Sequence, residues 1–141
     1  MQDFMYDDEH RMFRDAFREY IQRDIAPHEE EWTAAGICDP AAWRKAGENG
    51  FLCMDVPEAY GGLGAKDFRF NTIVSEEFAA ANISSLGFSV HTDIVVPYLT
   101  RLGTEEQKQR WLPKAIAGDL ITSIGMTEPN TGSDLQGIQT T

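Results

Sequence analysis

Cysteine is scarce in this sequence, and its placement limits what the protein can be. Cys38 and Cys53 are the two cysteines among 141 residues; they do not form a CxxC pair, and neither has a neighbouring histidine. Neither a disulfide framework nor a zinc site is therefore predicted. Two reduced thiols are typical of a cytoplasmic protein, which is the location we expect.

Basic residues are also few. The chain has 12 lysines and arginines against 23 acidic residues, which gives a formal net charge of −11. A field of this sign repels a phosphate backbone, so no nucleic-acid partner is expected.

Long uninterrupted hydrophobic runs are missing as well. The most apolar stretch, residues 86–102, is interrupted by His91, Asp93 and Arg101, and the chain does not open with a basic stretch followed by an apolar one. Neither a membrane span nor a signal peptide is predicted. With 42% hydrophobic and 25% charged residues, the chain is long enough to bury the core of an ordinary globular domain.

The first predicted helix covers residues 4–25. Apolar side chains recur in it at intervals of four, as expected for one buried face: Phe13, Phe17, Ile21 and Ile25. Asp7 or Asp8 can cap its free amides, and Pro27 closes it.

Two further helices are predicted before residue 82. Asp39 and Pro40, a capping carboxylate followed by a proline at the first helical position, start a short helix over 40–49 that Gly50 stops. A second periodic run covers residues 66–81. Between them, the proline- and glycine-rich segment 57–64 is predicted as a structural turn, because it lacks the spacing of a phosphate-binding loop.

The next segments predict two more helices. Residues 85–102 are apolar on nearly every side, which predicts a helix at the centre of the domain. A capping box at Thr104 and Gln107 predicts a helix from residue 105. Pro113 lies within it and predicts a kink or a restart before the helical region ends at residues 118–119.

The character of the chain changes after Leu120. Residues 120–126 have the composition of a strand, and a loop rich in helix-breaking residues follows over 129–133. We therefore predict an N-terminal helical domain over residues 1–119 and the truncated start of a β-domain over residues 120–141.

Residues 126–134 are the most site-like segment. The predicted strand delivers hydroxyls, carboxylates and free amides to one loop, where they could bind a polar ligand. From the residues alone, a turn stabilised by the side chains of Ser133 and Asp134 is the stronger interpretation, and ligand binding is the alternative.

The letters of this segment carry a family resemblance. MTEPNTGSD, residues 126–134, resembles the acyl-CoA dehydrogenase signature [MVC]TEPxxGSD, a loop that in that family lies against the flavin. PEAYGGLG over 57–64 and EEQKQRWLP over 105–113 support it in the right order, and residues 88–95 are most similar to the long-chain branch. The resemblance extends over essentially all 141 residues and implies an all-α fold, an up-and-down helical bundle, ahead of the β-domain.

The resemblance also implies an FAD site. Its residues would be Ile124, Met126, Thr127, Gly132 and Ser133. The backbone of Met126 and the hydroxyl of Thr127 would face the pyrimidine edge of the flavin, where fixed donors stabilise the charge that a hydride brings. Where the family commonly has glycine and alanine, this chain has Asn130 and Thr131, and asparagine tolerates a left-handed backbone better than most residues.

Acyl-CoA contacts are implied in two places. Ser133 would touch both flavin and acyl-CoA, and the predicted helix over 85–102 would form one wall of the acyl-chain tunnel. The tunnel residues would share one helical face: Ser85, Phe88, Ser89 and Thr92. Ordinary core packing is the alternative, and for any one of the four it is the stronger one.

By the same resemblance, the complete enzyme converts acyl-CoA to trans-2-enoyl-CoA in fatty acid β-oxidation. Electron-transfer flavoprotein would accept its electrons, and the enzyme would be a homotetramer or dimer. The catalytic glutamate would lie in a later helical domain outside this chain, so the chain alone is expected to be inactive. His28 and His91 have no obvious partner in the sequence and receive no role.

Two alternatives stay open. An acyl-CoA oxidase would use oxygen as acceptor, and the oxygen reactivity of the reduced full-length protein would distinguish it. A non-catalytic helical interaction module would lack the glutamate downstream of Thr141.

Overall fold

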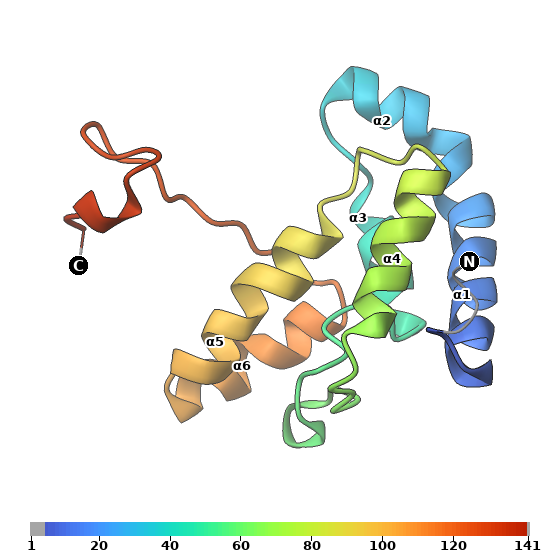
Figure 1. Ribbon diagram of the computed structural model, residues 1–141, viewed down its shortest axis with the longest axis horizontal. Coiled ribbons are helices and arrows are strands. Elements are labelled where there is room, and N and C mark those ends of the chain that lie inside the picture. The colour runs from blue at the N-terminus through green and yellow to red at the C-terminus, as the bar shows by residue number, and fades with distance from the viewer. Residues whose placement is uncertain (1–4, 141) are drawn as a thin grey trace.

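The protein is a bundle of short helices. The computed structural model describes residues 5–140, and no strand occurs within them (Figure 1). The α-helices are α1 (Asp8–Tyr20), α2 (Glu29–Ala35), α3 (Pro40–Glu48), α4 (Arg69–Ala80), α5 (Val96–Leu102) and α6 (Glu105–Ile116). The described residues also contain two π-helices, η1 (Ile21–Ile25) and η4 (Val90–Val95). Three 3-10 turns are present as well: η2 (Ala26–His28), η3 (Glu58–Tyr60) and η5 (Leu135–Gly137). The predicted all-α fold is confirmed.

The first helix, α1, has the N-terminal cap that the sequence predicts. The Asp7 carboxylate accepts hydrogen bonds from the amides of Glu9 and His10, so Asp7 is the N-cap. Helical backbone begins at Asp8 and continues through η1, so the helix predicted over residues 4–25 starts later than expected; its first predicted position, Phe4, lies outside the described residues.

The prediction that Pro27 closes the first helix is wrong. Pro27 lies at the start of the 3-10 turn η2, where a missing amide costs nothing, and the chain goes directly into α2. Gly36, with a left-handed φ of 69°, then ends α2. The sequence analysis missed this helix because its first turn is a run of three glutamates and its one buried residue is Trp32.

Aromatic rings form the core between α1 and α4. Phe17 is fully buried, and its ring packs at 5.0 Å from that of Phe51 and at 5.2 Å from that of Phe78, measured between centroids. Phe88 extends the cluster toward α3, where its ring lies 4.6 Å from that of Trp43. One continuous core therefore joins the N-terminal helices to the segment that precedes η4.

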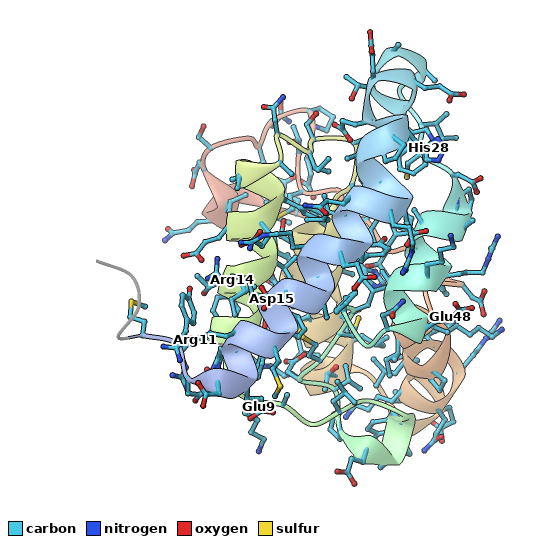
Figure 2. All side chains as sticks on the ribbon, turned by 90° about the vertical axis from the view of Figure 1, so that its right-hand side faces the viewer. Glu9, Arg11, Arg14, Asp15, His28 and Glu48 are labelled. Atoms are coloured by element: carbon cyan, nitrogen blue, oxygen red, sulfur yellow. The ribbon has the colours of Figure 1, made fainter. Side chains whose placement is uncertain are left out.

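A partly buried ion-pair cluster joins α1 to α4. The Glu77 carboxylate accepts from the guanidinium of Arg14 at 2.7 Å and from that of Arg18 at 2.8 and 2.9 Å. Figure 2 shows Arg14 on the side of α1 next to α4, whereas Asp15 faces outward. Burial opposes ionisation of Glu77, but the hydrogen bonds from Arg18 and Arg14 outweigh it and hold its pKa below the usual 4.5.

Glu77→Gln is expected to lower the free energy of unfolding by about 2 kcal/mol at pH 7. This is less than for a fully buried pair, because Arg18 is half exposed and solvent screens its charge. Since the folded pKa of Glu77 is depressed, its contribution is present above pH 4.5 and is lost as pH falls through the folded pKa. Urea unfolding at pH 7 and below pH 4 should show the difference between wild type and variant shrinking with acid. An undiminished difference would contradict an ionic origin.

The predicted central helix over 85–102 needs correction. Helical backbone begins at Phe88, continues as the π-helix η4 and becomes α-helical at Val96, immediately before Pro97. A π turn before a proline relieves the missing amide and the ring clash that a regular helix would suffer there. One face is open to solvent rather than surrounded: Val90, Ile94, Tyr98 and Leu102. No helix of the described residues is long and apolar enough to cross a membrane.

The last helix, α6, confirms the predicted capping box. Thr104 accepts from the amide of Gln107, whose side chain accepts in return from the amide of Thr104. The expected kink at Pro113 does not interrupt the helix, which runs on to Ile116. Gly118, with a φ of 73°, follows it.

Residues 121–127 are extended but do not form the predicted strand. No ladder partner lies beside them in residues 5–140, and a strand needs one to satisfy its amides. Figure 1 shows this segment leaving the helices beside the continuous helical stretch of η4 and α5 and carrying a small group of turns away from them. We call residues 121–140 the C-terminal arm; the division at residue 119 stays a prediction, as does the cytoplasmic location, although both cysteines are free.

Candidate functional site

The C-terminal arm is joined to the bundle at Thr122. Its amide donates to Nδ1 of His91 at 3.1 Å, and its hydroxyl lies 2.8 Å from the same nitrogen. His91 is fully buried in η4, so the start of the arm is fixed against the interior of the bundle. The sequence analysis found no partner for His91, which the structure corrects.

Beyond Thr122, the arm presents free polar groups. The backbone of residues 123–127 makes no hydrogen bond within residues 5–140. The hydroxyls of Thr127 and Ser133 are exposed and have no partner in the same described part of the chain. The remaining residues predicted to bind FAD are exposed too: Ile124, Met126 and Gly132. The arrangement offers a polar ligand unpaired donors beside two apolar side chains.

A tight turn holds the two ends of the predicted flavin loop together. Glu128 and Thr131 exchange backbone hydrogen bonds of 2.9 and 3.1 Å across Pro129 and Asn130. The Glu128 carboxylate accepts from the amides of Gln139 and Thr140. Hydrogen bonding to the side chain of Thr140, followed by these two amides, keeps the pKa of Glu128 below the usual 4.5. Thr127 and Ser133 therefore flank a defined turn.

Asn130 fits this turn without strain. A left-handed φ is recorded for Cys53 and Asn82 alone among the described non-glycine residues, so Asn130 does not need the backbone freedom of glycine. Thr131 is buried, and its hydroxyl donates to the carbonyl of Gly137 at 2.8 Å. The departure from the family pattern at these two positions is thus accommodated.

The residues predicted for the acyl tunnel separate into two groups. Phe88, Ser89 and Thr92 line one narrow crevice beside Phe51 and Met54. Ser85 precedes the helix, and its hydroxyl donates to the Glu29 carboxylate at 2.5 Å. The structure therefore gathers three of the four residues and gives the fourth a partner of its own.

An adjacent cavity contains charged residues that the sequence analysis did not select. It has a volume of about 420 Å³, and Thr92 lies on its wall together with Asp55, Lys66, Asn71, Asp93 and Arg101. Burial, with the nearby charge of Asp55, raises the pKa of Asp93 against the hydrogen bond from Asn71. The one sequence signal was Asp93 itself, a carboxylate within an apolar stretch. No group of His, Cys, Asp and Glu in residues 5–140 could hold a metal ion.

Comparison with known proteins shows the family of the chain. The model of the family "Acyl-CoA dehydrogenase, N-terminal domain" matches residues 7–119. The chain belongs to the acyl-CoA dehydrogenase family. It is 41% identical over 136 residues to the mitochondrial long-chain specific acyl-CoA dehydrogenase of Mus musculus, covering 96% of this chain and 31% of that protein.

Solved acyl-CoA dehydrogenases have the same fold. The acyl-CoA dehydrogenase from Geobacillus kaustophilus is 51% identical with a TM-score of 0.87, and the match covers 94% of this chain and 35% of that one. A glutaryl-CoA dehydrogenase from Mycobacterium smegmatis, in complex with FADH2, is 29% identical with a TM-score of 0.84, over 98% and 36% of the two chains. The chain therefore spans about a third of the length of these relatives, and a flavin is present in one of them.

Membership of the acyl-CoA dehydrogenase family raises the question whether the C-terminal arm fits a flavin. The donors of residues 123–127 that are unpaired within residues 5–140 suit a polar, planar ligand such as a flavin. The donor set of this chain thus fits the cofactor that the solved relative carries.

Proposed function

We propose that this chain is the part of an FAD-dependent acyl-CoA dehydrogenase that contacts one side of the flavin and of the acyl chain. The complete enzyme would convert acyl-CoA to trans-2-enoyl-CoA in fatty acid β-oxidation, with long-chain substrates favoured. The observation that carries the proposal is the exposed, unbonded segment 123–127 beside free hydroxyls of Thr127 and Ser133.

Ile124, Met126, Thr127, Gly132 and Ser133 are the proposed flavin contacts. When bound, FAD supplies the hydride acceptor for the desaturation. The Thr127 hydroxyl and the amides next to it would donate to the edge of the ring system, stabilising developing negative charge with groups already in place. The turn at Glu128 and Thr131 holds Thr127 and Ser133 at its two ends, which favours simultaneous contacts.

Phe88, Ser89 and Thr92 are the proposed wall for the acyl chain. Their shared crevice supports this role, and its small size in this chain leaves the opposite wall to other parts of the enzyme. Ser85 is not proposed as part of this wall, because its hydroxyl is bound to the Glu29 carboxylate in the loop before the helix. The catalytic glutamate, the contact with electron-transfer flavoprotein and the oligomer interface are proposed outside these residues, so the 141-residue chain alone should not turn over substrate.

Thr127→Val is expected to weaken FAD binding about tenfold, because it removes one hydroxyl donor to a charged edge and keeps the shape. The measurement is the flavin absorbance retained by the protein produced from the complete gene, titrated with FAD. Ser123→Ala, in the same open segment but outside the proposed contacts, is the matched control.

The outcomes separate the interpretations. A yellow wild type that fatty acyl-CoA bleaches, with weaker FAD binding in Thr127→Val alone, supports the proposal; rapid recolouring by oxygen would point to an oxidase. A complete gene product that never binds flavin would overturn the proposal and leave a helical interaction module.

A further inference from the structure

His91 is enclosed by three parts of the bundle. Its ring lies edge-on to Trp43 of α3, with centroids 5.4 Å apart and an interplanar angle of 84°. Nε2 lies 3.1 Å from the carbonyl of Ala115 in α6 and 3.4 Å from the Cys53 thiol. Burial raises the pKa of that thiol to about 12, so it stays a neutral neighbour.

The contacts of His91 fix its tautomer. The amide of Thr122 can only donate, so Nδ1 must be the acceptor and the ring proton must be on Nε2. Nε2–H then donates to the carbonyl of Ala115. Burial also lowers the pKa of His91, which keeps the ring neutral and Nδ1 free to accept.

The bond to Thr122 is the last one between bundle and arm. Within residues 5–140, every hydrogen bond made by residues 123–140 stays inside the arm, as in the pair Glu128 and Thr131. Thr122 stands two positions before Ile124, where the proposed flavin contacts begin. The direction in which the arm leaves the bundle is therefore set at His91.

We propose that His91 is a positioning residue, which orients the flavin-contacting segment by accepting the amide of Thr122 at Nδ1, with the Thr122 hydroxyl beside the same nitrogen. The role rests on the proposed function, because it matters only if residues 124–133 contact the flavin. Its location in a π-helical turn agrees with this role, since such turns point a chosen side chain away from the regular helical phase.

Two substitutions separate the two nitrogens of the ring. His91→Asn places an amide oxygen near Nδ1 and keeps an acceptor for Thr122, whereas His91→Gln keeps a donor near Nε2 and loses that acceptor. Thr122→Val removes the hydroxyl and leaves the backbone amide, on a half-exposed residue whose change does not threaten folding. His28→Gln is the control, because it removes another histidine ring that contacts a tryptophan, here Trp32, but from the exposed turn η2.

The first readout is amide hydrogen exchange at position 122 in the 141-residue chain. Protection there should fall about tenfold in His91→Gln, less in Thr122→Val, and be largely retained in His91→Asn, while amides of α1 and α4 keep wild-type protection. Equal protection at position 122 in wild type and His91→Gln would contradict the proposal that His91 holds Thr122. A parallel loss of protection in α1 and α4 would show a structural role only.

The second readout is FAD affinity of the complete gene product. It should weaken about tenfold in His91→Gln and recover in His91→Asn, with His28→Gln unchanged. Unchanged affinity in His91→Gln, despite lost protection, would overturn the positioning role. If wild type itself binds no FAD, the proposed function fails, and the exchange experiment still decides whether His91 holds the arm.

Discussion

Phe17→Ala should lower the free energy of unfolding by about 4 kcal/mol. Phe17 is fully buried and packs against the rings of Phe13, Phe51 and Phe78, which come from three separate segments. Removing its ring leaves a cavity that rigid aromatic neighbours cannot close, so the cavity cost adds to the lost burial. Thermal and urea unfolding, followed by far-ultraviolet circular dichroism, measure the loss.

Phe68→Ala is the matched control for this prediction. Phe68 is 64% exposed at the N-cap position of α4, so the same change of side chain removes little buried area. Its unfolding free energy should stay within about 0.5 kcal/mol of wild type. Equal losses at the two positions would show that the aromatic cluster is not the centre of stability.

Gly118→Ala should cost about 3 kcal/mol, the second largest effect. A Cβ at Gly118 would lie 2.2 Å from the carbonyl oxygen of Trp43, and the backbone φ of 73° is strained for any other residue. Because the obstacle is the backbone of α3 rather than a flexible side chain, α6 and α3 must move apart. The melting temperature is the direct measurement.

Gly36→Ala separates the two causes. Gly36 has nearly the same φ, 69°, but a Cβ there meets nothing within 4 Å. It should therefore cost only the conformational strain, about 1 kcal/mol. If both variants melt alike, the close approach of α3 and the end of α6 contributes nothing measurable.

The helix starts were predictable because their causes are local. Asp7, Asp39 and Thr104 cap amides two or three positions away, and the sequence displays donor and acceptor together. The helix α2 was not predicted, because a single buried residue, Trp32, gives no repeating pattern of apolar positions. Local chemistry thus identified most of the bundle, and the family resemblance supplied the proposed role of the arm.

The features that the sequence did not predict depend on contacts between residues far apart in the chain. His91 meets Thr122 across 31 positions, so no window of sequence could pair them. The solvent-facing side of η4 and α5 could not be distinguished from a central helix, because apolar composition does not say which faces have neighbours. The extended residues 121–127 had strand composition, but pairing requires a partner that composition cannot provide.

The π-helix before Pro97 has a consequence for how this region could change through evolution. A π turn contains one residue more than the α turn it replaces, and a one-residue deletion within Val90–Val95 would restore ordinary winding. Because a π turn fits its extra residue into about one turn, that deletion would leave the flanking turns in phase and change the directions of the side chains within Val90–Val95 itself. His91 and Thr92 would then face new neighbours without any amino-acid substitution, so a single codon gained or lost can retarget this wall of the bundle.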